Sequence, residues 1–343
     1  MKKEIAYIEN LIKDYPRSNK QLNSPFHSDA EIIKTNNGYL GVSVDAVSEE
    51  IELGLIKNPV TLGWLTVTAS VSDLSAIGMK TEKISVLLKD KDNNQSWQDE
   101  FFKGATLACD EYKISGMEKV LDTGAQALSA CTAYGLSINA PKLSRVGLNP
   151  GDSLFITGPV GWGNAVALAN IAIRAQGTEL ADSFDLGYRP LARCNEAQFI
   201  NKFSTVCIDT SDGLLSTLKW LEIFNKVKLN VHYKKSLLHP KALEVAAITK
   251  VDPWLFMASQ NGEFELLFAV SKNEKNDFLK AATDSGFSFM EFGYVSAGSG
   301  ILLNQKELNL DQLLDMLHDG VEPEKYIRRM LEFAVINDIR FKE

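Results

Sequence analysis

The chain has 343 residues, of which 45% are hydrophobic and 23% charged, and its formal net charge is −8. This length allows two domains that each bury a core, and the composition is ordinary for a soluble globular protein. The acidic balance, without any long basic run, argues against nucleic acid as a partner.

Four cysteines are scattered along the chain without a C-x-x-C pair. This pattern favours free thiols in a reducing compartment over a disulfide scaffold. The N-terminal stretch MKKEIAYIENLIKDY carries acids and lacks the apolar core of a signal peptide. No apolar run approaches the roughly 18 residues that a membrane span needs. We therefore expect a cytoplasmic protein that does not associate with a membrane.

The first part of the chain predicts a sheet with helices on one face. Apolar spacing predicts a short helix that stops before Pro16, and a turn signal at 36–38 joins a strand at 32–33 to a returning strand at 39–44. A helix over 59–78, a strand over 83–89, a helix between Trp97 and Tyr112 and a strand over 129–139 follow. This order is typical of an α+β layer.

A connection rich in proline and glycine, from Ala140 to Asp152, is the expected domain boundary. We expect an N-terminal domain over 1–142 and a C-terminal α/β domain over 150–343. The second domain is predicted to contain strands at 153–157, near 229–232 and at 263–270, and helices at 164–175, after Pro190, at 273–284, at 311–318 and from Pro323.

The stretch CIDTSDGLL, over residues 207–215, predicts a buried strand that ends in acids, with a helix behind it. Asp209, Ser211 and Asp212 offer oxygen ligands that suit Mg²⁺, at the end of a strand where open sheets place ligands. An alternative is a helix cap in which Asp212 serves the helix N-terminus. The stretch alone leaves both interpretations open.

Glycine patterns exclude two common nucleotide sites. The loop GPVGWG at 158–163 follows a strand, but its glycines do not have the G-x-G-x-x-G spacing, and no second strand ending in an acid follows. The chain also lacks a G-x-x-x-x-G-K-[ST] motif. Phosphate binding through either motif is therefore not expected.

A set of aspartates lies at strand ends or beside helix starts: Asp29, Asp45, Asp73, Asp122, Asp209 and Asp212. Burying a carboxylate such as Asp73, within SVSDLSAIG, is costly unless it is paired or bound to a metal. The set suggests a shared cation cluster. Six independent caps and turns remain an equal alternative on spacing alone.

Several motifs, in this order, resemble those of thiamine-monophosphate kinase: VSVDAVSEE, SVSDLSAIG, Asp122-Thr123, PGDSLFITGPVG, IDTSDGLL and GEFELLF. More broadly, they are similar to the superfamily of aminoimidazole ribonucleotide synthetase, selenophosphate synthetase and HypE. The resemblance implies a homodimer whose N-terminal sheets form a shared barrel, with ATP in a cleft between the two domains and Mg²⁺ held by aspartates.

The resemblance also implies roles for individual residues. Asp73 and Asp212 are expected to be catalytic, and Glu52 and Glu263 to lie near the substrate. The expected metal ligands are Asp29, Asp45, Asp73, Asp122, Asp209 and Asp212, and the expected nucleotide contacts are Ser43, Asp122, Thr123, Arg145 and Ser211.

The chain departs from the family pattern mainly on the acceptor side. Glu52-Leu53 stands where the kinase has a substrate-contacting His-Phe, and GEFELLF is one residue shorter than the kinase segment. His27-Ser28 replaces a Gly-Asp before Asp29, and Val120-Leu121 replaces two glycines. Replacing the two glycines by Val120-Leu121 puts close approach of the backbone to phosphate in doubt.

The leading hypothesis is an ATP- and Mg²⁺-dependent phosphotransferase that acts on thiamine monophosphate. Arg189 or Arg193 could add to the phosphate contacts, with surface solvation as the alternative role. A related kinase or synthetase with a different small-molecule acceptor, or a nucleotide-binding module without turnover, are the alternatives.

Overall fold

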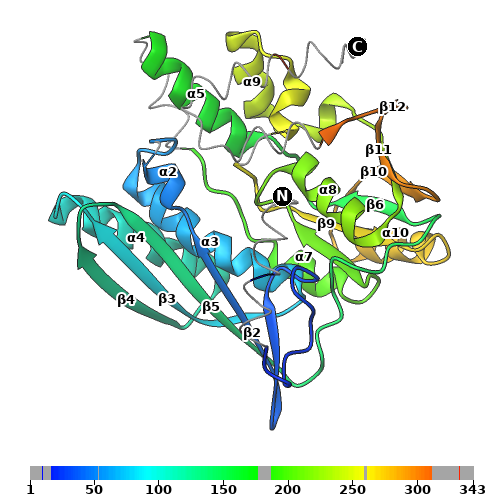
Figure 1. The fold of residues 1–343 in the computed structure, drawn as a ribbon, viewed down its shortest axis with the longest axis horizontal. Coiled ribbons are helices and arrows are strands. Elements are labelled where there is room, and N and C mark those ends of the chain that lie inside the picture. The colour runs from blue at the N-terminus through cyan, green and yellow to red at the C-terminus, as the bar shows by residue number, and fades with distance from the viewer. Residues whose placement is uncertain are drawn as a thin grey trace.

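The computed structural model describes residues 17–52, 54–176, 187–258 and 261–310, together with Asn10 and Glu332. The helices predicted before Pro16, at 311–318 and after Pro323 lie outside the described residues. Within these residues the chain forms two β-sheets with helices packed between and around them (Figure 1). The expected mixture of helices and strands is confirmed.

The first sheet has five strands. Their spatial order is β1 (Glu31–Thr35), β2 (Gly38–Ala46), β5 (Leu128–Ser137), β3 (Thr81–Asp90) and β4 (Gly116–Thr123). Neighbours run antiparallel except β3 and β4, which are parallel. In β3, Ile84, Val86 and Leu88 are fully buried and alternate with less buried residues. The sheet therefore has one face in the core and one face directed away from it.

Two long helices, α3 (Pro59–Ala76) and α4 (Gln95–Tyr112), cover the buried face of this sheet, and the short helix α2 (Ser48–Glu52) precedes them (Figure 1). The Asn58 side chain caps α3 by accepting hydrogen bonds from the backbone N–H groups of Val60 and Thr61. Pro59 occupies the first turn, where its missing N–H has no cost. The predicted layer of helices on one face is confirmed.

Helix α3 is buried almost all round, because it lies between the first sheet and α4 on one side and elements of the second region on the other. Apart from Asp73, its polar side chains carry short hydroxyl groups, which bond to neighbours on several sides of the helix. Thr66 donates to the Leu62 carbonyl oxygen, and Ser70 donates to the Cys131 carbonyl oxygen at 2.7 Å. A helix of this composition can bury its whole surface without leaving these polar groups unsatisfied.

The second sheet has seven strands. Their order is β12 (Lys306–Glu307), β11 (Gly300–Leu303), β8 (Lys228–Val231), β10 (Met290–Ser296), β6 (Ser153–Ile156), β9 (Leu266–Val270) and β7 (Val206–Asp209). All neighbours are antiparallel except β11 and β8. Edge strand β7 ends at Asp209 and is followed by helix α8, as predicted.

The remaining helices lie beside the second sheet or pack against one another at the top of Figure 1. They are α5 (Trp162–Gln176), α7 (Cys194–Ile200), α8 (Leu214–Asn225), α9 (Pro240–Thr249) and α10 (Lys275–Asp284), with 3₁₀ turns at Lys235–Leu237 and Pro253–Met257. Among the described helices, none combines the length and apolar character that crossing a bilayer requires.

The strand predicted at 263–270 is shorter than expected. It begins at Leu266, and Glu263 lies in the segment before it. Phe264 has a φ of 61°, a left-handed conformation that interrupts an extended strand. The prediction placed Glu263 inside a strand because the apolar run alone does not reveal this backbone reversal.

The close packing of α3 against α4 depends on glycine. A Cβ atom added at Gly104 would lie 1.9 Å from the Val60 carbonyl oxygen. We expect Gly104→Ala to lower the free energy of unfolding by about 2 kcal/mol, because overpacking outweighs the better helix propensity of alanine. Urea unfolding measures this change. Gly116→Ala is the control, since its nearest neighbour is the flexible Lys83 side chain at 3.4 Å; an equal effect of both substitutions would contradict the account.

Candidate metal centre

Three aspartates from distant parts of the chain meet beside helix α3. Asp29 lies in the loop before β1, Asp73 lies near the end of α3, and Asp209 ends β7. One carboxylate oxygen from each lies within 4.8 Å of those of the other two. The fold therefore brings together three of the six aspartates that the sequence selected as a cation cluster.

These carboxylates repel one another in a buried setting. Burial raises the pKa of Asp73 well above its usual value, and the charges of Asp209, Asp45 and Asp29 add to the effect. Burial, helped by the charge of Asp29, raises the pKa of Asp209 to about 7. Fully ionised, the group needs positive charge nearby.

Arg145 supplies part of that charge. Its Nη2 donates to Asp29 Oδ1 at 2.8 Å, and the Asp29 side chain has no exposed surface. The charge of Asp29 raises the pKa of Arg145 against the opposing effect of burial. Among the described residues, Arg145–Asp29 is the one ion pair made by any of the three aspartates. One positive charge therefore faces three carboxylates, and their negative charge is only partly balanced. The predicted contact of Arg145 with phosphate stays a prediction.

The donor set fits a hard divalent cation. All three groups offer carboxylate oxygens, which are the ligands that Mg²⁺ and Ca²⁺ prefer over nitrogen or sulfur. Asp29 Oδ2 is buried and has no hydrogen-bond partner. Leaving a buried acceptor without a hydrogen bond is costly. This oxygen is therefore a candidate ligand for a cation.

Serine hydroxyls hold two of the aspartates in place. Ser43 Oγ donates to Asp73 Oδ2 at 2.5 Å, and Ser211 Oγ donates to Asp209 Oδ1 at 2.8 Å. Both serines were predicted as nucleotide contacts, and here each orients a carboxylate. Ser72 Oγ donates to Asp209 Oδ2 at 2.6 Å and was missed by the sequence analysis. Its only sequence signal is its position beside Asp73.

Two further predicted ligands lie near the cluster but outside the group of three. Asp45, at the end of β2, is close enough that its charge raises the pKa of Asp73. Burial raises its own pKa, against a hydrogen bond from the Ala46 N–H. Asp212 is exposed in the turn after β7. The N-cap residue of α8 is Gly213, so Asp212 is not itself the N-cap residue.

Asp122 and Thr123 lie elsewhere in the described structure. Both are exposed at the end of edge strand β4, where Asp122 pairs with Lys89 of β3. The group of three does not include Asp122, and the predicted roles of both residues stay predictions. Glu52 ends α2, and its side chain lies outside what the structure describes.

The glycine loop at 158–163 packs against acids. Glu263 is 4% exposed, and its Oε1 accepts a hydrogen bond from the Gly161 N–H at 2.6 Å. A Cβ atom at Gly158 would lie 2.6 Å from Glu265 Oε1. These glycines let the loop backbone approach the segment around Glu263 and Glu265 closely. This packing accounts for the glycines of the loop without a bound dinucleotide. Burial raises the pKa of Glu263 well above its usual value.

The two further arginines considered for phosphate are engaged with protein groups. Arg193 forms an ion pair with Glu265, which its Nε also meets at 2.7 Å, and a second pair with Glu196 at 3.4 Å. Arg189 lies over the Trp64 ring at 5.8 Å. Arg193 is not simply a solvated surface residue either, because its positive charge pairs with the negative charge of the buried Glu265.

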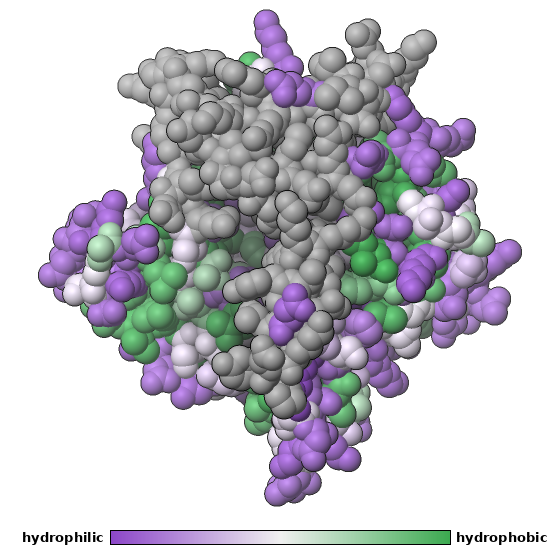
Figure 2. Space-filling model, viewed as in Figure 1, coloured by the Kyte–Doolittle hydropathy of each residue, from purple (hydrophilic) through white to green (hydrophobic). Residues whose placement is uncertain are grey.

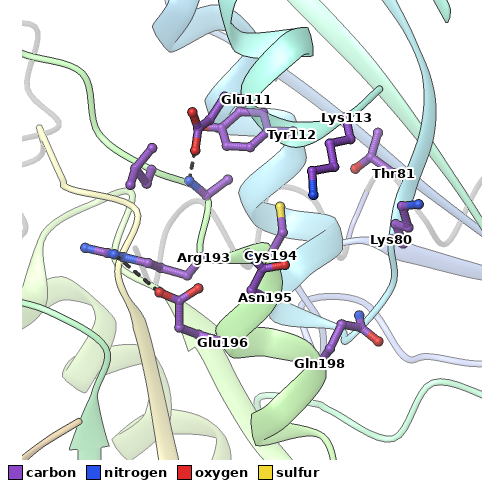
Figure 3. Close-up of a pocket in the computed structure, with 12 residues that line it drawn as sticks. Lys80, Thr81, Glu111, Tyr112, Lys113, Arg193, Cys194, Asn195, Glu196 and Gln198 are labelled. Carbon is purple, nitrogen blue, oxygen red and sulfur yellow. Dashed lines mark hydrogen bonds and ion pairs between the residues drawn. The ribbon is translucent and has the colours of Figure 1, made fainter. Parts of the chain in front are cut away.

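A surface pocket of about 210 Å³ lies between the start of β3, the end of α4 and the start of α7 (Figure 3). Lys80 and Lys113 extend from one wall, and Arg193 and Glu196 from the other. None of the three aspartates lines this pocket. The pocket therefore gives no direct support to the candidate metal centre.

Comparison with known proteins agrees with the resemblance seen in the motifs. Residues 27–135 match the family model described as AIR synthase related protein, N-terminal domain. Over 316 residues the chain is 23% identical to the thiamine-monophosphate kinase of Buchnera aphidicola subsp. Schizaphis graminum, covering 89% of this chain and 95% of the relative.

Solved structures share the fold. The structure described as AaThiL complexed with AMPPCP and TMP matches with a TM-score of 0.73 and 21% identity, covering 89% of this chain and 94% of that one. E. coli HypE, a hydrogenase maturation protein, matches with a TM-score of 0.62 and 15% identity, over 90% and 98% of the two chains. The resemblance to thiamine-monophosphate kinases and to their wider superfamily is confirmed.

The raised pKa of Asp73 should make the folding stability of the metal-free protein depend on pH. Its carboxyl loses a proton less readily in the folded than in the unfolded state, so folding stability falls as the pH rises above about 4. We expect Asp73→Asn to raise the melting temperature in EDTA at pH 8 and to raise it less at pH 5. Thermal unfolding at both pH values measures this.

The control is Asp92→Asn, which removes an exposed carboxylate in the turn after β3. It should leave the melting temperature nearly unchanged at both pH values. Equal shifts for Asp73→Asn at pH 5 and pH 8, or a destabilised variant at pH 8, would show that repulsion within the cluster is not the cause.

Proposed function

We propose that this chain is a cytoplasmic kinase that uses ATP and Mg²⁺ to phosphorylate thiamine monophosphate. The observation that carries the proposal is the meeting of Asp29, Asp73 and Asp209 within 4.8 Å in a fold shared with AaThiL. The relative that matches 95% of its own length is named thiamine-monophosphate kinase. The site chemistry and the full-length likeness point to the same activity.

The aspartate group would hold Mg²⁺ through oxygens of Asp29, Asp73 and Asp209. When bound, Mg²⁺ neutralises phosphate charge and stabilises the charge that develops during phosphoryl transfer. Such cations would also offset the repulsion between a nucleoside triphosphate and a protein of formal net charge −8. Ser43, Ser72 and Ser211 fix the carboxylates in place, so that binding requires little rearrangement of the protein.

The transfer itself requires no strong base. A terminal phosphate oxygen of thiamine monophosphate attacks the γ-phosphorus of ATP, the bond to the β,γ-bridging oxygen breaks, and ADP and thiamine diphosphate form. The attacking phosphate is already ionised at neutral pH, so there is no proton to remove first. The protein's part is to align the two phosphates and to stabilise charge.

An assay of ADP and thiamine diphosphate formation from Mg-ATP and thiamine monophosphate tests the activity. We expect turnover in the wild type and a loss of roughly 100-fold or more in kcat for Asp73→Asn and Asp209→Asn, since both remove a cluster carboxylate. Asp92→Asn is the control and should keep wild-type turnover. Unchanged activity in both cluster variants would contradict the proposed role of the cluster.

Other outcomes would select the alternatives. ADP formation with other acceptors, but not with thiamine monophosphate, would indicate a related kinase or synthetase. Tight binding of AMPPCP without any turnover would indicate a nucleotide-binding module. Both outcomes would overturn the choice of thiamine monophosphate while leaving the cation cluster in place.

We further propose that two chains associate through their first sheets, in the shared barrel that the resemblance implies. The face of this sheet directed away from α3 and α4 exposes apolar residues on strands β2, β5 and β4. Val44 is 69% exposed, Leu136 62% and Val120 44%. Figure 2 shows hydrophobic residues gathered over the part of this sheet that Figure 1 draws at the lower left. Apolar residues exposed on several strands of one sheet face are typical of a protein interface.

Charged substitutions on this face test the association. We expect Val44→Lys and Leu136→Lys to convert a dimer into a monomer, because burying an unpaired ammonium group in an apolar interface is costly. Light scattering after size-exclusion chromatography measures the mass. Leu279→Lys on α10, where Leu279 is 38% exposed, is the control and should remain dimeric. A monomeric wild type, or dimeric variants, would contradict this assembly.

A further inference from the structure

A side-chain hydrogen bond joins the helix that carries one cluster aspartate to the strand that carries another. Ser72 Oγ, on α3, donates to Asp209 Oδ2 at the end of β7, at 2.6 Å. Ser72 is fully buried and Asp209 is 3% exposed. Water therefore does not compete for this contact, and the bond links two elements that belong to different halves of the chain.

The second oxygen of the same carboxylate is held from its own turn. Ser211 Oγ donates to Asp209 Oδ1 at 2.8 Å. The Ser211 backbone N–H also donates to Oδ1, at 3.3 Å, whereas Oδ2 accepts only from Ser72 among the described residues. Since a carboxylate oxygen has two lone pairs, one lone pair of Oδ2 stays available to a cation. The carboxylate is fixed at both ends while it keeps its capacity as a ligand.

We propose that Ser72 is a positioning residue for the candidate metal centre, acting through Asp209. The inference rests on the proposed cation cluster and adds to it a residue without direct contact to the cation. Asp73 follows Ser72 directly on α3, so one helix supplies both a ligand and the donor that aims the ligand from β7. Hydrogen bonds of this kind orient metal ligands, and losing one typically lowers metal affinity 10- to 100-fold.

Repulsion explains why this bond matters. Asp29 and Asp73 push against Asp209 in a buried space, and the Asp209 carboxylate gains by turning away from them. The Ser72 hydroxyl opposes that rotation, because turning would break a buried hydrogen bond and leave a hydroxyl unsatisfied. Without Ser72, a cation would have to reassemble the group on binding and would bind more weakly.

Titration of metal-free protein with Mn²⁺, followed by the electron paramagnetic resonance signal of the free ion, tests the proposal without relying on turnover. We expect Ser72→Ala to bind Mn²⁺ 10- to 100-fold more weakly than the wild type. The matched control is Ser70→Ala on the same helix, where a fully buried hydroxyl donates instead to the Cys131 carbonyl oxygen. It should keep Mn²⁺ affinity within about threefold of the wild type, because no cluster ligand is touched.

A second pair of variants separates the hydroxyl from packing. Ser72→Thr keeps the donor, and Ser72→Val has nearly the same shape without it. We expect the threonine variant to bind Mn²⁺ roughly tenfold more tightly than the valine variant. Equal affinities within this pair, or equal losses in Ser72→Ala and Ser70→Ala, would overturn the positioning role. Circular dichroism selects the variants that are folded.

Asp73→Asn in the same titration separates this inference from the function it rests on. Weak Mn²⁺ binding by Asp73→Asn together with normal binding by Ser72→Ala would overturn the role of Ser72 and leave the cluster standing. Normal Mn²⁺ binding by Asp73→Asn would overturn the cluster, and the inference about Ser72 with it.

Discussion

Concentrated negative charge in a buried place is the constraint on which this structure depends. Asp29, Asp73 and Asp209 present oxygens within 4.8 Å of one another, and Arg145 offsets only part of their charge. Such a group is unstable in isolation, because ionised carboxylates this close repel strongly in a low dielectric. The arrangement is reasonable for a protein that binds divalent cations, since cation binding turns the repulsion into attraction.

Helix α3 makes this arrangement possible. It lies between the two sheets, and its small residues and short hydroxyls let neighbours approach from every side. Glycines at the crossing with α4 bring the backbones close enough to leave no gap. From this position α3 directs Asp73 toward Asp209 of the second sheet. The rigidity of the centre therefore comes from packing around one helix, reinforced by the serines that orient its carboxylates.

The sequence predicted the elements well, because strands and helices leave periodic patterns. The strand, turn and helix around Asp209, the one-sided layer of helices and the selection of Asp29 and Asp73 all follow from such patterns or from family motifs. Contacts between distant segments are different. Arg193 pairs with Glu265, which lies 72 positions further along the chain, and Ser72 bonds to Asp209, which lies 137 positions further. Neither contact leaves a local signal in the sequence.

The left-handed backbone at Phe264 was also invisible in the apolar pattern, which is why the strand was expected to begin too early. Asp122 illustrates a third limit. Its motif suggested a metal ligand. In the described structure it is exposed on edge strand β4 and is not part of the group formed by Asp29, Asp73 and Asp209. Motifs indicate which residues matter to a family, whereas the fold decides which of them meet within one chain.

Three aspartates that form one divalent-cation site should be visible directly as ligands of a bound metal. The most direct measurement is a crystal structure of the protein grown with Mn²⁺ and AMPPCP, with anomalous scattering recorded at a wavelength where manganese contributes. We expect an anomalous peak at roughly 2.2 Å from oxygens of Asp29, Asp73 and Asp209, a distance near that of Mg²⁺–oxygen bonds. Manganese bound elsewhere, with the three carboxylates bridged only by water or by Arg145, would contradict it.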